Sequence, residues 1–143
     1  LVRSRGLGDV YKRQLVVLPP QAEKEAGFLS ALERLANVVG NTGAKAVFYA
    51  APATLDLIRE RFARSSNEIG YVPFANWEDF LIVSRDVRTD DTLWIWMSRR
   101  NGVSYESSMA RVSRYLDQYF KGNNFVLVYP LQASIDEGSR YLT

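Results

Sequence analysis

The stretch LVVLPPQAEKEAGFLSALERLANVVGNTGAKAVFYA, residues 15–50, contains a strand, a helix and a second strand in succession. Leu15–Leu18 is a short apolar run ended by two prolines, which is typical of a strand buried on both faces of a parallel sheet. Ala46–Ala50 is a second run of this kind. Between them, apolar residues recur at helical spacing, and Gly40 and Gly43 are suited to end the helix. The helical set is Phe28, Leu29, Leu32, Leu35, Ala36 and Val39.

The same alternation continues to the end of the chain. Pro52 suits the first turn of a second helix that carries Leu55, Ile58 and Phe62 on one side. Asn76 is a suitable cap for a third helix, with Trp77, Phe80, Leu81, Ser84 and Val87 on one side. A fourth helix carries Met109, Val112, Leu116 and Phe120 and is closed by Gly122. The remaining predicted strands are Ile69–Val72, Thr92–Met97 and Phe125–Tyr129.

Five strands that alternate with four helices indicate an α/β fold with a mostly parallel, doubly wound sheet. We expect the strand order 3-2-1-4-5, with helices on both faces. We also expect one domain over residues 15–132 and a loose polar tail over residues 133–143.

Residues 4–14 resemble the translation of a DNA sequencing adapter rather than a natural protein segment. They are Ser-Arg-Gly-Leu-Gly-Asp-Val-Tyr-Lys-Arg-Gln. Read back into codons, they match the end of a transposase-type sequencing adapter without a mismatch. We therefore expect residues 1–14 to be a non-native leader and the natural N-terminal part to be missing. The alternative is a natural basic arm that binds nucleic acid, with Arg3, Arg5, Lys12 and Arg13 as its contacts.

The charge balance depends on this leader. The whole chain has 18 Lys and Arg against 16 Asp and Glu. Four of the basic residues lie within residues 1–14, but only one of the acidic residues, Asp9, does. The rest of the chain is therefore slightly acidic. A nucleic-acid partner is therefore not expected. The chain has no Cys and no His, which removes disulfides, thiolate metal sites and the commonest general base. We expect no metal, no cofactor, no catalytic residues and no enzyme activity.

The loop after the fourth predicted strand is the candidate ligand site. In an open α/β sheet, ligands bind outside the carboxyl ends of strands where the strand order reverses. With order 3-2-1-4-5, that point lies between the loops at Pro19–Glu23 and Ser98–Ser104. The second loop is polar, cationic and contains a glycine, so it is a candidate site for an anion or nucleotide. Its candidate residues are Ser98, Arg99, Arg100, Asn101, Gly102 and Ser104. The alternative is an ordinary solvated loop.

Other polar and aromatic residues favour structural roles. Asp90-Asp91 suits a turn, and Glu78-Asp79 suits the first turn of a helix, where negative charge is favoured. The hydroxyls of Ser98, Ser104 and Ser108 have no histidine to activate them. Trp94 and Trp96 are two apart on a strand and share a face. We expect core packing there, with a stacking platform as the functional alternative.

Four segments together resemble a known family. They are residues 18–28 (LPPQAEKEAGF), 77–81 (WEDFL), 98–105 (SRRNGVSY) and 125–132 (FVLVYPLQ). They are similar to the C-terminal cytosolic region of bacterial cation:proton antiporters of the Bacteroidetes type, which is itself similar to a universal stress protein domain. The resemblance covers residues 15–132.

The resemblance implies a regulatory or assembly domain on the cytoplasmic side of the inner membrane. A transmembrane domain of the same chain, missing here, would exchange Na⁺ or K⁺ for H⁺. It also implies a homodimer through the last strand, Phe125, Val126, Leu127, Val128 and Tyr129. The stress-protein nucleotide pattern, Gly-x2-Gly-x9-Gly-Ser/Thr, is absent after residue 97, where only Gly102 precedes Gly122. A stand-alone nucleotide-binding stress protein is therefore the second hypothesis, and an α/β enzyme ranks last.

Overall fold

The computed structural model describes residues 13–43, 45–74, 83–99, 102–105, 107–120 and 122–130. These residues form a sheet of five strands in the order β3-β2-β1-β4-β5. All four strand pairings are parallel. The predicted α/β class, strand order and parallel sheet are therefore confirmed. The strands are β1 (Gln14–Val17), β2 (Ala46–Ala50), β3 (Ile69–Pro73), β4 (Thr92–Trp96) and β5 (Asn124–Val128).

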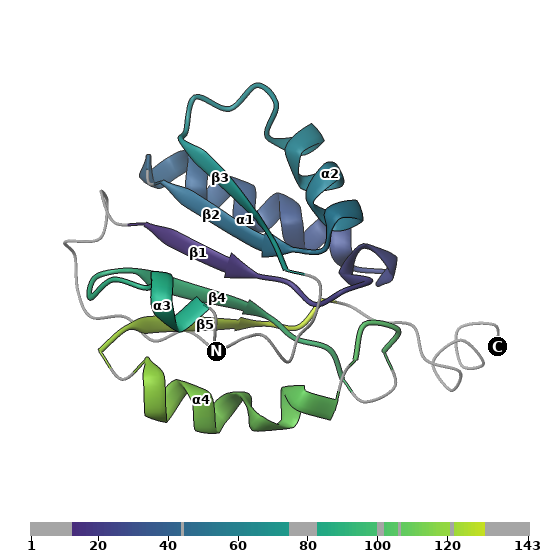
Figure 1. Ribbon diagram of the computed structural model, residues 1–143. Coiled ribbons are helices and arrows are strands. Elements are labelled where there is room, and N and C mark those ends of the chain that lie inside the picture. The colour runs from purple at the N-terminus through teal and green to yellow at the C-terminus, as the bar shows by residue number, and fades with distance from the viewer. Residues whose placement is uncertain are drawn as a thin grey trace, which may run out of the picture.

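The helices lie on both faces of the sheet (Figure 1). They are α1 (Phe28–Thr42), α2 (Pro52–Arg61), α3 (Val83–Asp86) and α4 (Val112–Tyr119). Two 3₁₀ segments complete the set, η2 (Ala22–Lys24) and η4 (Ser107–Arg111). Along the chain, α1 and α2 connect β1 to β2 and β2 to β3 in one direction across the sheet. The connection from β3 to β4, which contains α3, and the connection from β4 to β5, which contains α4, run in the opposite direction. Because parallel crossovers are right-handed, this reversal of direction puts the two pairs on opposite faces.

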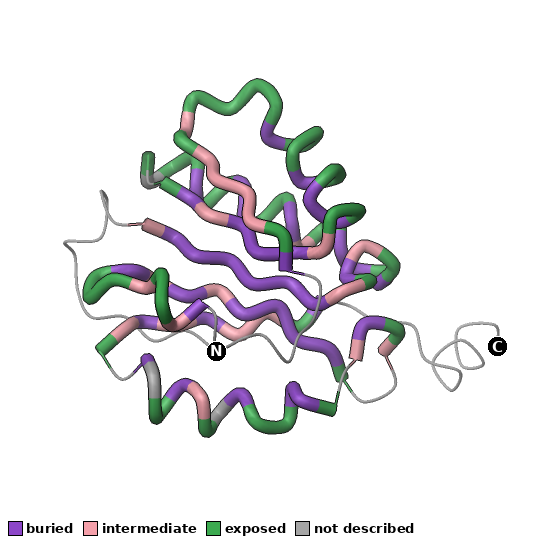
Figure 2. Tube along the Cα trace, viewed as in Figure 1, coloured by how far each residue is buried: buried purple, intermediate pink, exposed green. Residues whose placement is uncertain are grey.

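Each face has its own apolar core. Under α1 and α2, the sheet contributes Val16, Phe48 and Trp96. On the opposite face, Leu15, Leu93 and Ile95 pack with side chains that include Met109 and Leu116. Strand β1 is buried along its whole length, as Figure 2 shows. Burial on both faces explains why its sequence is a continuous apolar run rather than an alternating one.

Most predicted elements are displaced by a residue or two. Gly43 ends α1 in the left-handed conformation, with φ 67°, and its N–H donates to the Val39 carbonyl. Gly40 lies inside the helix, so its predicted role as a terminator is wrong. The fourth helix begins as 3₁₀ at Ser107 and becomes α-helical at Val112. Strand β5 begins at Asn124 and ends at Val128, so Tyr129 lies beyond the strand to which it was assigned.

Some expectations fall on residues outside the described ranges. These are the helix cap at Asn76 with Trp77, Phe80 and Leu81, the pair Glu78-Asp79, and the tail at 133–143. Of the third predicted helix, the described part is α3, in which Val83 is buried. Asp91 has the predicted turn role, because its carboxylate accepts the backbone N–H of Arg88 at 2.7 Å.

Two residues assigned to the non-native leader belong to the folded sheet. Gln14 is the first residue of β1, aligned with Ala46 on one side and Thr92 on the other. Its side-chain oxygen accepts the Trp94 indole N–H at 2.6 Å. The guanidinium of Arg13 donates to both carboxylate oxygens of Asp91, at 3.1 and 2.6 Å. The sheet therefore begins one residue before the predicted boundary, because Gln14 is paired with both neighbouring strands.

This ion pair belongs to a polar cluster at the amino ends of β1 and β4. The carboxylate of Asp91 has a side-chain exposure of only 4%. Its hydrogen bond with Arg13 raises the pKa of that guanidinium, against the opposing effect of burial. Nearby, the Tyr49 hydroxyl donates to Asp86 at 3.0 Å. Burial, then the hydrogen bond to Asp86, raise the pKa of Tyr49 well above its ordinary value.

Candidate functional site

The carboxyl ends of β1 and β4 meet where the strand order reverses. After β1, the chain passes through Pro19 and Pro20 to Gln21, which has a left-handed backbone with φ 68°. This conformation is unusual for a residue that is not glycine and costs about 1 kcal/mol. The turn leads into η2 and then to Glu25, which lies three residues before the first residue of α1. The other wall of the crevice is the loop after β4.

Glu25 crosses this crevice and is held by the opposite loop. One carboxylate oxygen, Oε2, accepts three hydrogen bonds. The Ser98 hydroxyl donates at 3.0 Å, the Ser104 hydroxyl at 2.6 Å and the Ser104 backbone N–H at 3.2 Å. All three residues are buried, with exposures of 6%, 3% and 2% for Glu25, Ser98 and Ser104. A carboxylate removed from water in this way requires such donors, because each missing one would leave buried charge uncompensated.

The predicted site residues therefore divide into groups. Ser98 and Ser104 are brought together, and they hold an anionic group that belongs to the same chain. Arg99 is exposed, and its guanidinium lies 5.1 Å from the centre of the Tyr129 ring. The backbone N–H of Gly102 donates to the Arg99 carbonyl in a turn. Arg100 and Asn101 lie outside the described residues.

Glu25 is not among the residues predicted from the sequence. The predicted facing loop, Pro19–Glu23, ends two residues before it. A lone glutamate between Lys24 and Ala26 has no motif that distinguishes it from a surface residue. The only sequence signal for such a partner is weak. The two serines, six residues apart, need a buried hydrogen-bond acceptor once their loop packs against the sheet.

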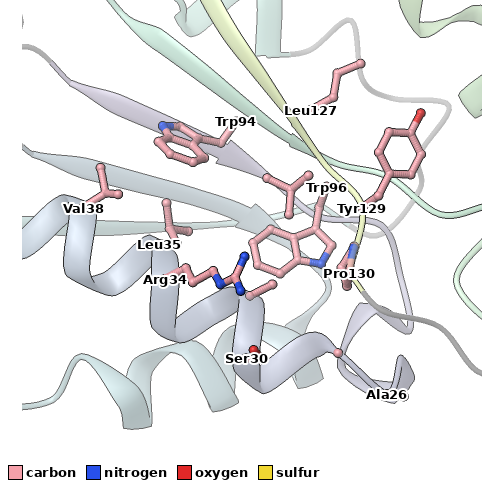
Figure 3. Close-up of a pocket in the computed structure, with 13 residues that line it drawn as sticks. Ala26, Ser30, Arg34, Leu35, Val38, Trp94, Trp96, Leu127, Tyr129 and Pro130 are labelled. Atoms are coloured by element: carbon pink, nitrogen blue, oxygen red, sulfur yellow. The ribbon is translucent and has the colours of Figure 1, made fainter. Parts of the chain in front are cut away.

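A cavity of about 450 Å³ lies beside this crevice, between α1 and the part of the sheet formed by β4 and β5 (Figure 3). Side chains of α1 pack on β1 and β2, and among the described residues no other helix lines the cavity above β4 and β5. The indoles of Trp94 and Trp96 lie on that face, as predicted. Trp96 is fully buried and its ring centre is 5.8 Å from that of Phe28. Core packing is thus confirmed for Trp96, while Trp94 is only partly buried.

The cavity wall has an asymmetric set of polar groups. Arg34 of α1 lines it, and none of the described lining residues is acidic. The indole N–H of Trp96 is buried and has no hydrogen-bond acceptor among the described residues. The indole N–H of Trp94, by contrast, is bonded to Gln14. The wall therefore contains two donors, the Arg34 guanidinium and the Trp96 N–H, for which the described residues supply no partner.

The described ranges contain no group of three or more acidic side chains placed to hold a metal ion. Within the same part of the chain, no helix has the length and apolarity needed to cross a bilayer. No protein-family model, no curated protein and no solved structure matches this chain.

Proposed function

We propose that this chain is a noncatalytic regulatory or assembly domain on the cytoplasmic side of a bacterial cation:proton antiporter. Two features support the proposal. The four segments quoted above resemble the cytosolic region of such antiporters. The parallel sheet with order β3-β2-β1-β4-β5 is the architecture that this resemblance implies. Transport of Na⁺ or K⁺ against H⁺ would belong to a separate membrane part of the same protein.

The observation that carries the noncatalytic role is the position of Glu25. In doubly wound folds, the crevice at the switch point is the usual ligand site. Here the two serines that could meet a phosphate are already bonded to a carboxylate. A nucleotide entering this crevice would have to displace Glu25 or place its own negative charge beside it, and both cost free energy. The geometry therefore favours a domain that does not turn over nucleotides.

The position of β5 supports the assembly role. It is an edge strand, paired with β4 on one side only. An edge strand presents unpaired backbone N–H and carbonyl groups that can pair with another chain. Beyond it, Tyr129 keeps 45% of its surface exposed. We propose that two copies associate through β5, which gives an isologous interface if the strands run antiparallel.

The proposal is tested first by the DNA that precedes the Leu15 codon in the source sample. We expect adapter-like DNA to vanish and an open reading frame with several long apolar segments to replace it. The intact antiporter would then be compared with a version that lacks residues 15–132. Ion exchange should persist in the truncated protein with an altered rate or altered dependence on pH or ion concentration. A start codon immediately before Leu15 would overturn the proposal.

A second test separates this role from a stand-alone nucleotide-binding stress protein. The chain is melted with and without 5 mM ATP and titrated with ATP in a calorimeter. We expect no rise in melting temperature and no binding heat. A ligand at one hundred times its Kd would raise the free energy of unfolding by about 2.7 kcal/mol, so tight binding is easily detected. A clear rise that is lost in Ser104→Ala would favour the nucleotide-binding protein.

A further inference from the structure

We propose that the cavity between α1, β4 and β5 is a binding site for a small amphipathic anion with a planar apolar body and one carboxylate. The inference does not depend on the antiporter assignment. The cavity volume of about 450 Å³ falls within the range of small-molecule sites. Its wall combines apolar side chains with few polar groups, which is the composition expected of such sites.

The apolar body of the ligand follows from the aromatic wall. The partly buried ring of Trp94 borders one side of the cavity, next to the fully buried Trp96, and α1 contributes Leu35 and Val38 on the other side. Val38 keeps 36% of its surface exposed there. A flat ring system inserted between the two sides would remove apolar surface from water on both its faces. A polar or strongly branched ligand would not match this shape.

The negative charge of the ligand follows from the charges that line the cavity. Arg34 is exposed and has no ion-pair partner among the described residues. The adjacent acid, Glu33, is engaged by Arg61 of α2, with Nε–Oε2 and Nη2–Oε1 distances of 2.5 Å. Glu25, three residues before the same helix, is engaged by the serines of the crevice. Both nearby carboxylates are thus committed elsewhere, and a guanidinium recognises a planar carboxylate through paired hydrogen bonds.

The buried indole of Trp96 supplies an independent observation. Its N–H has no hydrogen-bond acceptor among the described residues, although buried polar groups are nearly always bonded. In Figure 3 this indole lies between the Arg34 side chain and Pro130, with its nitrogen toward Pro130. The nitrogen is covered in the structure, so an acceptor on the ligand satisfies this donor by displacing the side chain that covers it. The site therefore fits a planar body with an anion at one end and a neutral oxygen at the other.

The test uses 2-naphthoate, 6-hydroxy-2-naphthoate and 2-naphthylmethylamine as probes of matched size. Binding to the full chain is measured by calorimetry and by quenching of tryptophan fluorescence. We expect both carboxylates to bind at submillimolar concentration and the amine to bind at least tenfold more weakly. The hydroxyl should strengthen binding about threefold. Absence of naphthoate binding at 5 mM, or equal binding of the amine, would overturn the proposal.

Two variants locate the binding to this cavity. Arg34→Gln removes the charge of an exposed side chain and keeps a polar one, so it should fold normally and bind 2-naphthoate at least tenfold more weakly. The matched control is Arg59→Gln, because Arg59 lies on α2 and does not line the cavity. Trp96→Phe keeps an aromatic ring without the N–H and should abolish the gain from the hydroxyl. Unchanged naphthoate affinity in Arg34→Gln, with a normal circular dichroism spectrum, would contradict the assignment.

Discussion

The crevice between β1 and β4 and the cavity beside it differ in whether their polar groups have partners within the chain. In the crevice, the two serines and the carboxylate of Glu25 satisfy one another within the same chain. In the cavity, Arg34 and the Trp96 N–H lack such partners among the described residues. The crevice lies where doubly wound folds usually bind ligands, yet the Glu25 side chain of the same chain already occupies it. A site is therefore better identified by its unsatisfied groups than by its position in the fold.

The first prediction concerns another internally satisfied pair, Arg13 with Asp91. Replacing Arg13 with alanine leaves a carboxylate of 4% exposure without its cation. We expect the free energy of unfolding to fall by about 3 kcal/mol, as measured by urea denaturation. The control is Lys45→Ala, whose partner Glu68 is 70% exposed and which should cost less than about 0.5 kcal/mol. Equal effects of the two variants would show that Asp91 does not depend on Arg13.

Glu25→Ala should have the next largest effect on stability. It removes the acceptor of three hydrogen bonds and leaves two buried serine hydroxyls to find other partners. We expect a loss of about 2 kcal/mol in the same urea experiment. The exposed Glu60 of α2 is the matched control, and its alanine variant should stay within about 0.5 kcal/mol of the wild type. A neutral Glu25→Ala would mean that the crevice is not internally satisfied.

A pair of serine substitutions compares the two sites with the same chemical change. Ser104→Ala removes a hydroxyl that donates to Glu25 at 2.6 Å in a buried setting. It should lower the free energy of unfolding by about 1.5 kcal/mol. Ser30→Ala, in the exposed rim of the cavity on α1, should be neutral or slightly stabilising because alanine favours helix. Thermal melting of both variants checks the order, and a reversed order would contradict the comparison.

The smallest effect on stability is expected for Arg34→Gln. The side chain is exposed and not engaged in an ion pair among the described residues, so the urea midpoint should stay within the error of the measurement. A loss above about 1 kcal/mol would mean that Arg34 supports the fold rather than a ligand. The polar groups of the cavity would then serve the fold, as those of the crevice do.

The sequence predicted the sheet well because its strands are unambiguous. Runs such as Leu15–Leu18 and Ala46–Ala50 are short, apolar and bounded by proline, glycine or charge, so each was located to within a residue. The ends were less accurate where two conformations compete, as in η4, where a 3₁₀ turn precedes Val112. Neither end of β5 is marked by an apolar-to-polar change, since Asn124 is buried and Tyr129 is half exposed.

The sites were harder to predict because they depend on which residues face each other. Ser98 and Ser104 were identified from their loop, but their partner Glu25 lies 73 residues or more away in the chain. The cavity lies between α1 and the strands β4 and β5, an arrangement that no local pattern encodes. Trp94 and Trp96 were correctly placed on one face, but only the fold shows that their shared side borders an open cavity.

The contrast between the two sites can be read in a single titration followed by ¹H–¹⁵N correlation NMR. The indole N–H signals of Trp94 and Trp96 report on the cavity, and the Ser104 amide reports on the crevice. When 6-hydroxy-2-naphthoate is added, we predict a large, saturable shift of the Trp96 indole signal and no shift of the Ser104 amide. A shift of the Ser104 amide with an unchanged Trp96 signal would contradict the account, because the anion would then occupy the crevice and not the cavity.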